Sequence, residues 1–138
     1  MRILIDVNVL IDAITGRKPF DETAQKLVLY FERHYSENFV TADSLTNLYY
    51  VLRRLTKSRV KTREVMESTL ELFRVLDITE SDCRLALKSG REDFEDAVLM
   101  ETAHRNHIDY IVTRNVKDFS HSPVPVISPA EFLKKVEK

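Results

Sequence analysis

The sequence predicts an α/β fold with three layers, α/β/α, in which a mostly parallel central sheet lies between helices. Short apolar segments alternate with longer stretches of helical period, and this alternation is typical of a parallel sheet covered on both faces. The first segment starts at residue 2, with no room for a preceding element, so we interpret it as a central strand buried on both faces. The five predicted strands are residues 2–5, 38–41, 75–78, 110–113 and 124–127.

Length and composition indicate one globular domain over residues 1–138. With only 2 glycines and 4 prolines, the chain has little material for linkers. The net charge of -1 predicts no general attraction to nucleic acid or to a membrane, so such binding would need a local patch. The single cysteine, Cys83, excludes an internal disulfide. Because we find neither a signal peptide nor a membrane-length apolar run, we expect a cytoplasmic protein.

The helices of the N-terminal half follow from apolar residues at helical spacing. A short helix over 7–14 is expected to break near Gly16. A longer helix covers 20–35, with Asp21 as its expected N-cap. The clearest helix in the middle of the chain covers 44–57.

The C-terminal half continues the same alternation. Helices over 62–73 and 93–106 lie on either side of a shorter helix in the sequence. Thr79 and Asp82 have the spacing of a capping box that opens this shorter helix, and Gly90 is expected to end it.

The last strand and helix carry strong position signals. Pro125 cannot donate a hydrogen bond to a neighbouring strand, so its strand is expected at an edge of the sheet. Ser128, Pro129 and Glu131 are typical of a helix start, as N-cap, first helical residue and capping-box acid.

Carboxylates follow two of the strands. Asp6 ends the first strand, and Asp118 lies a few residues past the fourth. Because ligands of open α/β sheets bind outside the carboxyl ends of the strands, both side chains can reach one crevice. Asp93 and Asp96 are three residues apart on a helix and share a face, from which Glu95 is expected to point away.

Three or four carboxylates in one crevice repel one another unless a cation joins them. Oxygen ligands without a His or Cys cluster favour Mg²⁺ or Mn²⁺. Structural interpretations compete for each residue. Asp6 is equally an N-cap, Asp93 and Asp96 suit the positive end of a helix, and Asp118 suits a turn. The basic run Arg53–Arg63 is more often a solvated helix face than a phosphate site.

Four short motifs stand in order along the chain: IDVNVL at 5–10, DFEDA at 93–97, IVTRN at 111–115 with DF at 118–119, and PVISPAEFL at 125–133. Their order and spacing resemble a PIN domain, the metal-dependent ribonuclease fold that includes toxins of VapBC-type toxin–antitoxin pairs. The resemblance covers essentially the whole chain. It implies that Asp6, Asp96 and Asp118 are catalytic metal ligands, and that Thr113 and Asn115 orient a ligand or the attacking water.

One position departs from the family pattern. The family usually carries a Glu in the helix after the second strand, and the segment that begins at Ser44 places Asn47 there. Asn47 offers a neutral oxygen but no charge, so one metal position is expected to weaken. Asp93, one turn from Asp96, could restore the charge, and Asp43 is the less suitable substitute.

The reaction implied by the resemblance is hydrolysis of RNA phosphodiester bonds with Mg²⁺ or Mn²⁺, leaving a 5′-phosphate and a 3′-hydroxyl. Arg114, Arg53 and Arg54 would hold flanking phosphates without reading the sequence. In this family a small antitoxin protein silences the toxin. Apolar residues such as Tyr50 and Leu52 would suit a homodimer, although ordinary burial explains them too.

Two other interpretations stay open. The chain could be a PIN-like module that binds RNA or a protein partner with little or no catalysis, with Asn47 marking the loss. A phosphatase with Asp6 as covalent nucleophile is the weakest alternative, because such enzymes place a second Asp where Asn8 stands.

Overall fold

The computed structural model describes residues 1–34 and 37–137, so Tyr35, expected on the second helix, lies outside the described residues. Its centre is a parallel sheet with strand order β3-β2-β1-β4-β5. The first strand of the chain is therefore the middle one, as its apolar sequence predicts. The strands are β1 (Ile3–Ile5), β2 (Asn38–Thr41), β3 (Arg74–Leu76), β4 (Tyr110–Val112) and β5 (Val126–Ile127).

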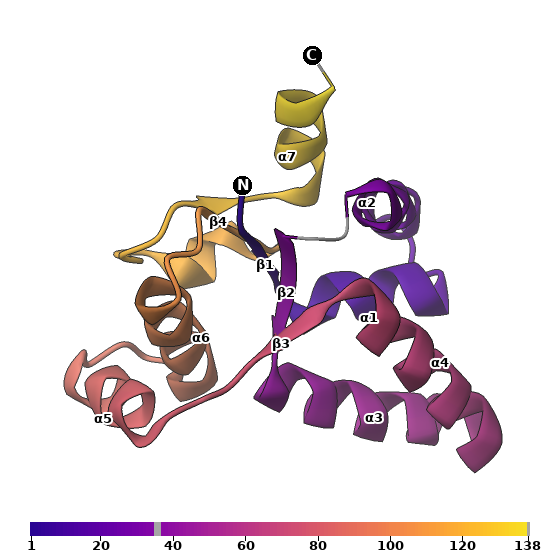
Figure 1. The fold of residues 1–138 in the computed structure, drawn as a ribbon, viewed down its shortest axis with the longest axis horizontal. Helices are drawn as coiled ribbons and strands as arrows, with labels where there is room; N and C mark the ends of the chain where they lie inside the picture. The colour runs from indigo at the N-terminus through magenta and orange to yellow at the C-terminus, as the bar shows by residue number, and fades with distance from the viewer. Residues whose placement is uncertain (35–36, 138) are drawn as a thin grey trace.

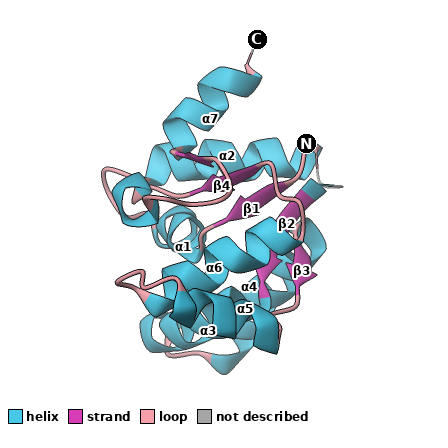
Figure 2. Cartoon of the chain, turned by 90° about the vertical axis from the view of Figure 1, so that its left-hand side faces the viewer, coloured by secondary structure: helices cyan, strands magenta, loops and turns pink. Residues whose placement is uncertain are grey.

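Helices cover both faces of this sheet, which confirms the α/β fold in three layers (Figure 1). In the view turned by 90°, α5 and α6 lie in front of the strands (Figure 2). Among the helices of the described residues, none combines the length and apolar character needed to cross a membrane. One face carries α1 (Val7–Thr15), α2 (Asp21–Arg33), α3 (Ala42–Thr56), α4 (Arg59–Leu72) and α7 (Pro129–Val136), and the other carries α5 (Glu80–Lys88), α6 (Phe94–Arg105) and the 3₁₀ helix η2 (Val116–Phe119).

An apolar core lies on each face of the sheet, and successive residues of a strand point into opposite cores. Ile3 and Ile5 pack with α1, α2, α3 and α7, whereas Leu4 packs with α6 on the opposite face. Leu52 packs among the helices on the first face of the sheet and is 1% exposed, so ordinary burial, the alternative to a homodimer surface, explains this residue. Tyr50, two residues before it, is 64% exposed.

Hydroxyl caps start two helices earlier than predicted. Thr41 accepts a hydrogen bond from the Ser44 N–H and caps α3, and Ser58 caps α4. The expected N-cap of α2 is wrong by one position, because Phe20 is the N-cap and Asp21 lies in the first turn.

Two predicted helix starts and the predicted edge strand are confirmed. Thr79 and Asp82 form a full capping box at α5, since each side chain accepts from the backbone N–H of the other. Ser128 caps α7, with Pro129 as its first residue. The strand that follows Pro125 lies at an edge of the sheet.

Asp82 also joins α5 to α6. Its carboxylate, only 1% exposed, accepts hydrogen bonds from Arg105 Nε (2.9 Å) and Nη2 (2.8 Å) and from Thr102 Oγ1 (3.3 Å). Burial raises the pKa of Asp82, but the hydrogen bonds from Arg105 and Thr79 outweigh it and hold the pKa below its ordinary value. This buried ion pair fixes α6, the helix whose first turn carries predicted site residues.

Candidate active site

Asp6 lies at the carboxyl-terminal edge of the sheet, directly after β1. Its backbone N–H donates to the Val112 carbonyl (2.9 Å), which extends the β1–β4 ladder by one residue. Asp6 occupies the N-cap position of α1, but its carboxylate makes no capping hydrogen bond of ordinary geometry to the described residues of that helix. Burial raises the pKa of Asp6, and the nearby N–H groups of Asn8 and Val7 lower it only in part, so the N-cap interpretation explains the backbone of Asp6 better than its side chain.

Thr113, directly after β4, orients the Asp6 carboxylate. The fully buried Thr113 hydroxyl donates to Asp6 Oδ2 (2.8 Å) and accepts from the Asn115 N–H (3.1 Å). The two residues that the resemblance assigned to orientation thus connect to Asp6 through one hydroxyl group.

The first turn of α6 brings further acids to the same edge. Asp93 is the N-cap of α6, and its Oδ1 accepts from the Asp96 N–H (2.9 Å). The structural role expected of an acid at a helix start is therefore real for Asp93. Asp93 nevertheless also lines the cleft described next.

A cleft of about 450 Å³ unites the predicted acids. Asp6, Asp96 and Asp118 all line it, together with Asn47 and Asn115. Its remaining lining residues are Val7, Asn8, Ile11, Tyr50, Val51, Arg54, Asp93, Glu95 and Phe119.

A small pocket beside the cleft shares three of its acids, Asp6, Glu95 and Asp96, and adds Asp43 and Ser44. Ser44, a predicted supporting residue, is 7% exposed and accepts a hydrogen bond from the Thr41 hydroxyl. Its role in the structure is thus to shape the start of α3.

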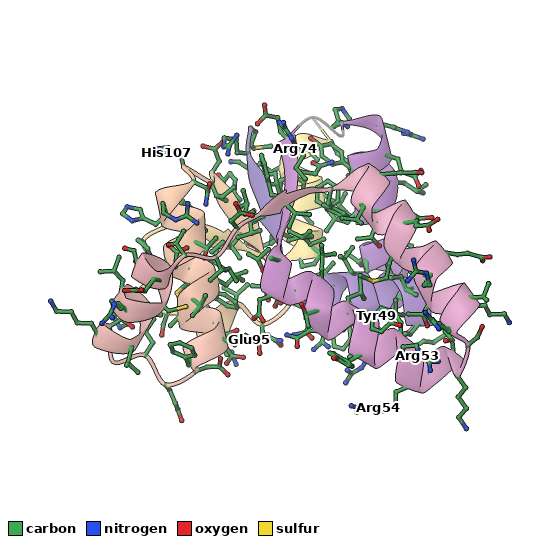
Figure 3. The ribbon with its side chains drawn as sticks, turned by 60° about the horizontal axis from the view of Figure 1, so that its bottom comes forward. Tyr49, Arg53, Arg54, Arg74, Glu95 and His107 are labelled. Carbon is green, nitrogen blue, oxygen red and sulfur yellow. The ribbon has the colours of Figure 1, made fainter. Side chains whose placement is uncertain are left out.

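Asn47 on α3 and Glu95 on α6 meet across the cleft. Asn47 Nδ2 donates to Glu95 Oε1 at 2.8 Å, although the two residues are 48 positions apart. Figure 3 shows Glu95 between these helices, whereas Arg74 and His107 lie toward the opposite edge of the sheet. The expectation that Glu95 points away from the acids is therefore wrong, because the helix turns this side chain toward α3.

The cleft concentrates negative charge. Burial, and then the nearby charge of Asp93, raise the pKa of Asp96 to about 7. Burial and the charges of Asp43 and Asp93 raise the pKa of Glu95, and burial raises the pKa of Asp6. An electrostatic environment of this kind favours protons or a cation.

The three predicted phosphate-binding arginines occupy different positions. Arg54 lines the cleft, and Figure 3 shows it on α3 below Arg53, which is not among the cleft-lining residues of the described chain. Arg114 Nε donates to the buried Asp12 carboxylate (2.7 Å), and its guanidinium lies 4.7 Å from the centre of the Phe20 ring. Arg114 therefore joins α1 to the segment after β4.

A family model described as PIN domain matches residues 2–117 of the chain. The chain belongs to the PIN domain family. PIN domains are generally nucleases that depend on divalent metal ions. A search of the curated proteins found no match.

Solved structures share the PIN fold of this chain at low sequence identity. A toxin–antitoxin complex from Klebsiella pneumoniae is 22% identical, with a TM-score of 0.68 over 92% of this chain and 97% of that chain. DNA-bound VapBC from Salmonella typhimurium is 21% identical (TM-score 0.68; 94% and 98% covered). FitAcB from Neisseria gonorrhoeae is 22% identical (TM-score 0.66; 93% and 98% covered).

The donor set of this PIN domain fits a hard divalent ion. Its cleft offers carboxylate and amide oxygens, and repulsion between neighbouring acids adds to burial in raising the pKa values of Glu95 and Asp96. Within residues 1–34 and 37–137, no three His, Cys, Asp or Glu side chains form a ready-made metal site.

Stability without metal should fall as the pH rises from 5 to 8. The folded-state pKa of Asp96 is about 7 against an ordinary 3.8, so between these values the folded protein holds a proton that the unfolded chain has lost. The free energy of unfolding therefore decreases with pH in this window and levels off above it. We expect Tm in chelator to fall across this range, and Asp96→Asn to flatten the slope. If Tm falls equally steeply with pH in the original protein and in Asp96→Asn, the pH dependence does not come from Asp96.

Glu95 is the site residue that sequence reasoning missed. Its spacing on the helix predicted that it points away from the face shared by Asp93 and Asp96. The signal that identifies it is the amide of Asn47, and this contact depends on how α3 packs against α6.

Proposed function

We propose that this PIN domain is a Mg²⁺- or Mn²⁺-dependent ribonuclease that hydrolyses RNA phosphodiester bonds, and that it is the toxin of a toxin–antitoxin pair. The observation that carries the proposal is the convergence of Asp6, Asp96 and Asp118 on one cleft. Acids from three separate segments meet there at the edge of the sheet where α/β proteins bind ligands.

In this proposal each side chain of the cleft has a separate role. Asp6, Asp96 and Asp118 would hold the ion, with added negative charge from Asp93. When bound, such an ion supplies a lowered pKa for an attacking water and neutralises charge on the phosphate. The Thr113 hydroxyl keeps the Asp6 carboxylate in one orientation.

The RNA backbone is the part of the substrate that this cleft suits. Arg54 brings a cation to a cleft otherwise rich in acids, and we assign it a flanking phosphate. The phosphate roles proposed for Arg53 and Arg114 are secondary, since Arg114 already pairs with Asp12.

An antitoxin protein is the proposed partner. The similar structures named as a toxin–antitoxin complex and as VapBC support it, because the chain shares their fold over more than nine-tenths of its length. A cytoplasmic location and a homodimer belong to the same proposal.

Incubation of the purified protein with total RNA tests the activity. With Mn²⁺ we expect cleavage to fragments that carry 5′-phosphates, and with chelator we expect none. Cleavage that persists in chelator would contradict the metal dependence. Binding of RNA without cleavage in Mn²⁺ would favour the non-catalytic module, and cleavage of single-stranded DNA alone would contradict RNA as substrate.

A further inference from the structure

We propose that Glu95 is a metal-binding carboxylate of the cleft and that Asn47 holds it in place. This inference rests on the metal-dependent function proposed above. It assigns to the Asn47–Glu95 pair the negative charge that Asn47 alone cannot supply.

The contact of Glu95 is unusual for an acid in the first turn of a helix. Such an acid ordinarily stays in solvent, where the helix dipole stabilises it without a specific partner. Glu95 is also solvent-exposed, but in addition it accepts a 2.8 Å hydrogen bond from Asn47 on a different helix, and it lines both the cleft and the small pocket beside it. Asp6 and Asp96 line the same two hollows.

The amide at position 47 suits this arrangement. Asn47 donates one N–H to Glu95 Oε1, which leaves a carboxylate further acceptor capacity because each oxygen has two lone pairs. A carboxylate at position 47 would stand against Glu95 at the same short distance, and the two charges would repel in the absence of a cation. One amide and one acid therefore fit together where two acids would not.

Asp93 is less suited to the same task. Its Oδ1 accepts from the Asp96 N–H and closes the start of α6, so the structure already uses this side chain locally. Glu95 has no such duty in α6, and its hydrogen bond points across the cleft.

Calorimetric titration of Mn²⁺ into the metal-free protein tests the inference. Glu95→Gln keeps the shape of the side chain and an oxygen for Asn47, and we expect it to weaken Mn²⁺ binding by about 10-fold or more. The exchange N47E/E95Q returns one carboxylate to the same place from the other helix, and we expect Mn²⁺ affinity within about threefold of the original protein.

Matched variants separate this inference from the proposed function. Glu131→Gln removes the same charge from an exposed acid in the first turn of another helix, α7, outside the cleft lining of the described chain, and should leave Mn²⁺ affinity unchanged. Asp96→Asn should weaken binding. If Asp96→Asn weakens binding and Glu95→Gln does not, or if the exchange fails to restore it, the role of Glu95 is wrong. If Mn²⁺ does not bind or Asp96→Asn has no effect, the proposed metal site is wrong, and the role of Glu95 with it.

Discussion

Replacing Asp6 with asparagine is expected to reduce Mn²⁺-dependent RNA cleavage by about 100-fold or more. Substitutions one shell away from a metal typically cost about 10- to 100-fold, and Asp6 is a proposed direct ligand at the centre of the cleft. Asparagine preserves the shape and an oxygen that can accept from the Thr113 hydroxyl, so the loss should reflect charge rather than geometry. Initial rates on a defined RNA at saturating Mn²⁺ measure the effect.

The same substitution should leave the metal-free fold intact. Burial raises the pKa of Asp6, which means that the folded protein holds this charge at a cost in free energy. Asparagine removes that cost, so Tm in chelator should stay equal or increase. Asp77→Asn is the matched control, because Asp77 also directly follows a strand but is absent from the cleft lining of the described chain. Cleavage that survives in Asp6→Asn, or that falls equally in Asp77→Asn, would be incompatible with Asp6 as a ligand.

Replacing Arg105 with alanine should lower the free energy of unfolding by about 3 kcal/mol, which corresponds to roughly 10 °C in Tm. The reason is the carboxylate of Asp82, which stays buried after its charged partner is removed. We place the cost at the lower end of the range for broken buried pairs, because the Arg105 side chain is 38% exposed. Urea unfolding followed by circular dichroism provides the measurement.

Arg84→Ala serves as the control for Arg105→Ala. Arg84 pairs with Glu80 on α5, but these side chains are 77% and 80% exposed. An exposed pair of this kind contributes about 0.5 kcal/mol or less, so its loss should barely change Tm. Similar losses in the two variants would show that burial of Asp82 does not determine the effect.

Most of the fold could be predicted from patterns of residues that are close together in the sequence. The uninterrupted apolar residues of β1 indicated a central strand, and Thr79 with Asp82 marked a helix start through bonds made within three residues. Misplaced boundaries have equally local causes. Thr41 and Ser58 both cap helices that apolar periodicity alone would start later, because capping residues precede the first buried position.

The candidate site was predictable only in part. Asp6 and Asp118 could be placed together because neighbouring parallel strands end at the same edge of a sheet. Two contacts could not be foreseen, Asn47 with Glu95 and Arg114 with Asp12. Both join residues far apart in the sequence. The first depends on how α3 packs against α6, and the second on where the segment after β4 lies against α1, and periodicity specifies neither.

The position of β1 between β2 and β4 has a consequence for the order of assembly. Asp6 and Thr113 are 107 residues apart, and Asp96 and Asp118 also come from the last third of the chain. A nascent chain that has emerged only as far as β3 contains Asp6 and Asn47, while β1 still lacks the neighbour that orients Asp6. Contacts between such distant segments form late, because the intervening loop must close first. The acidic cleft therefore cannot be complete until the chain has been synthesised at least as far as Asp118.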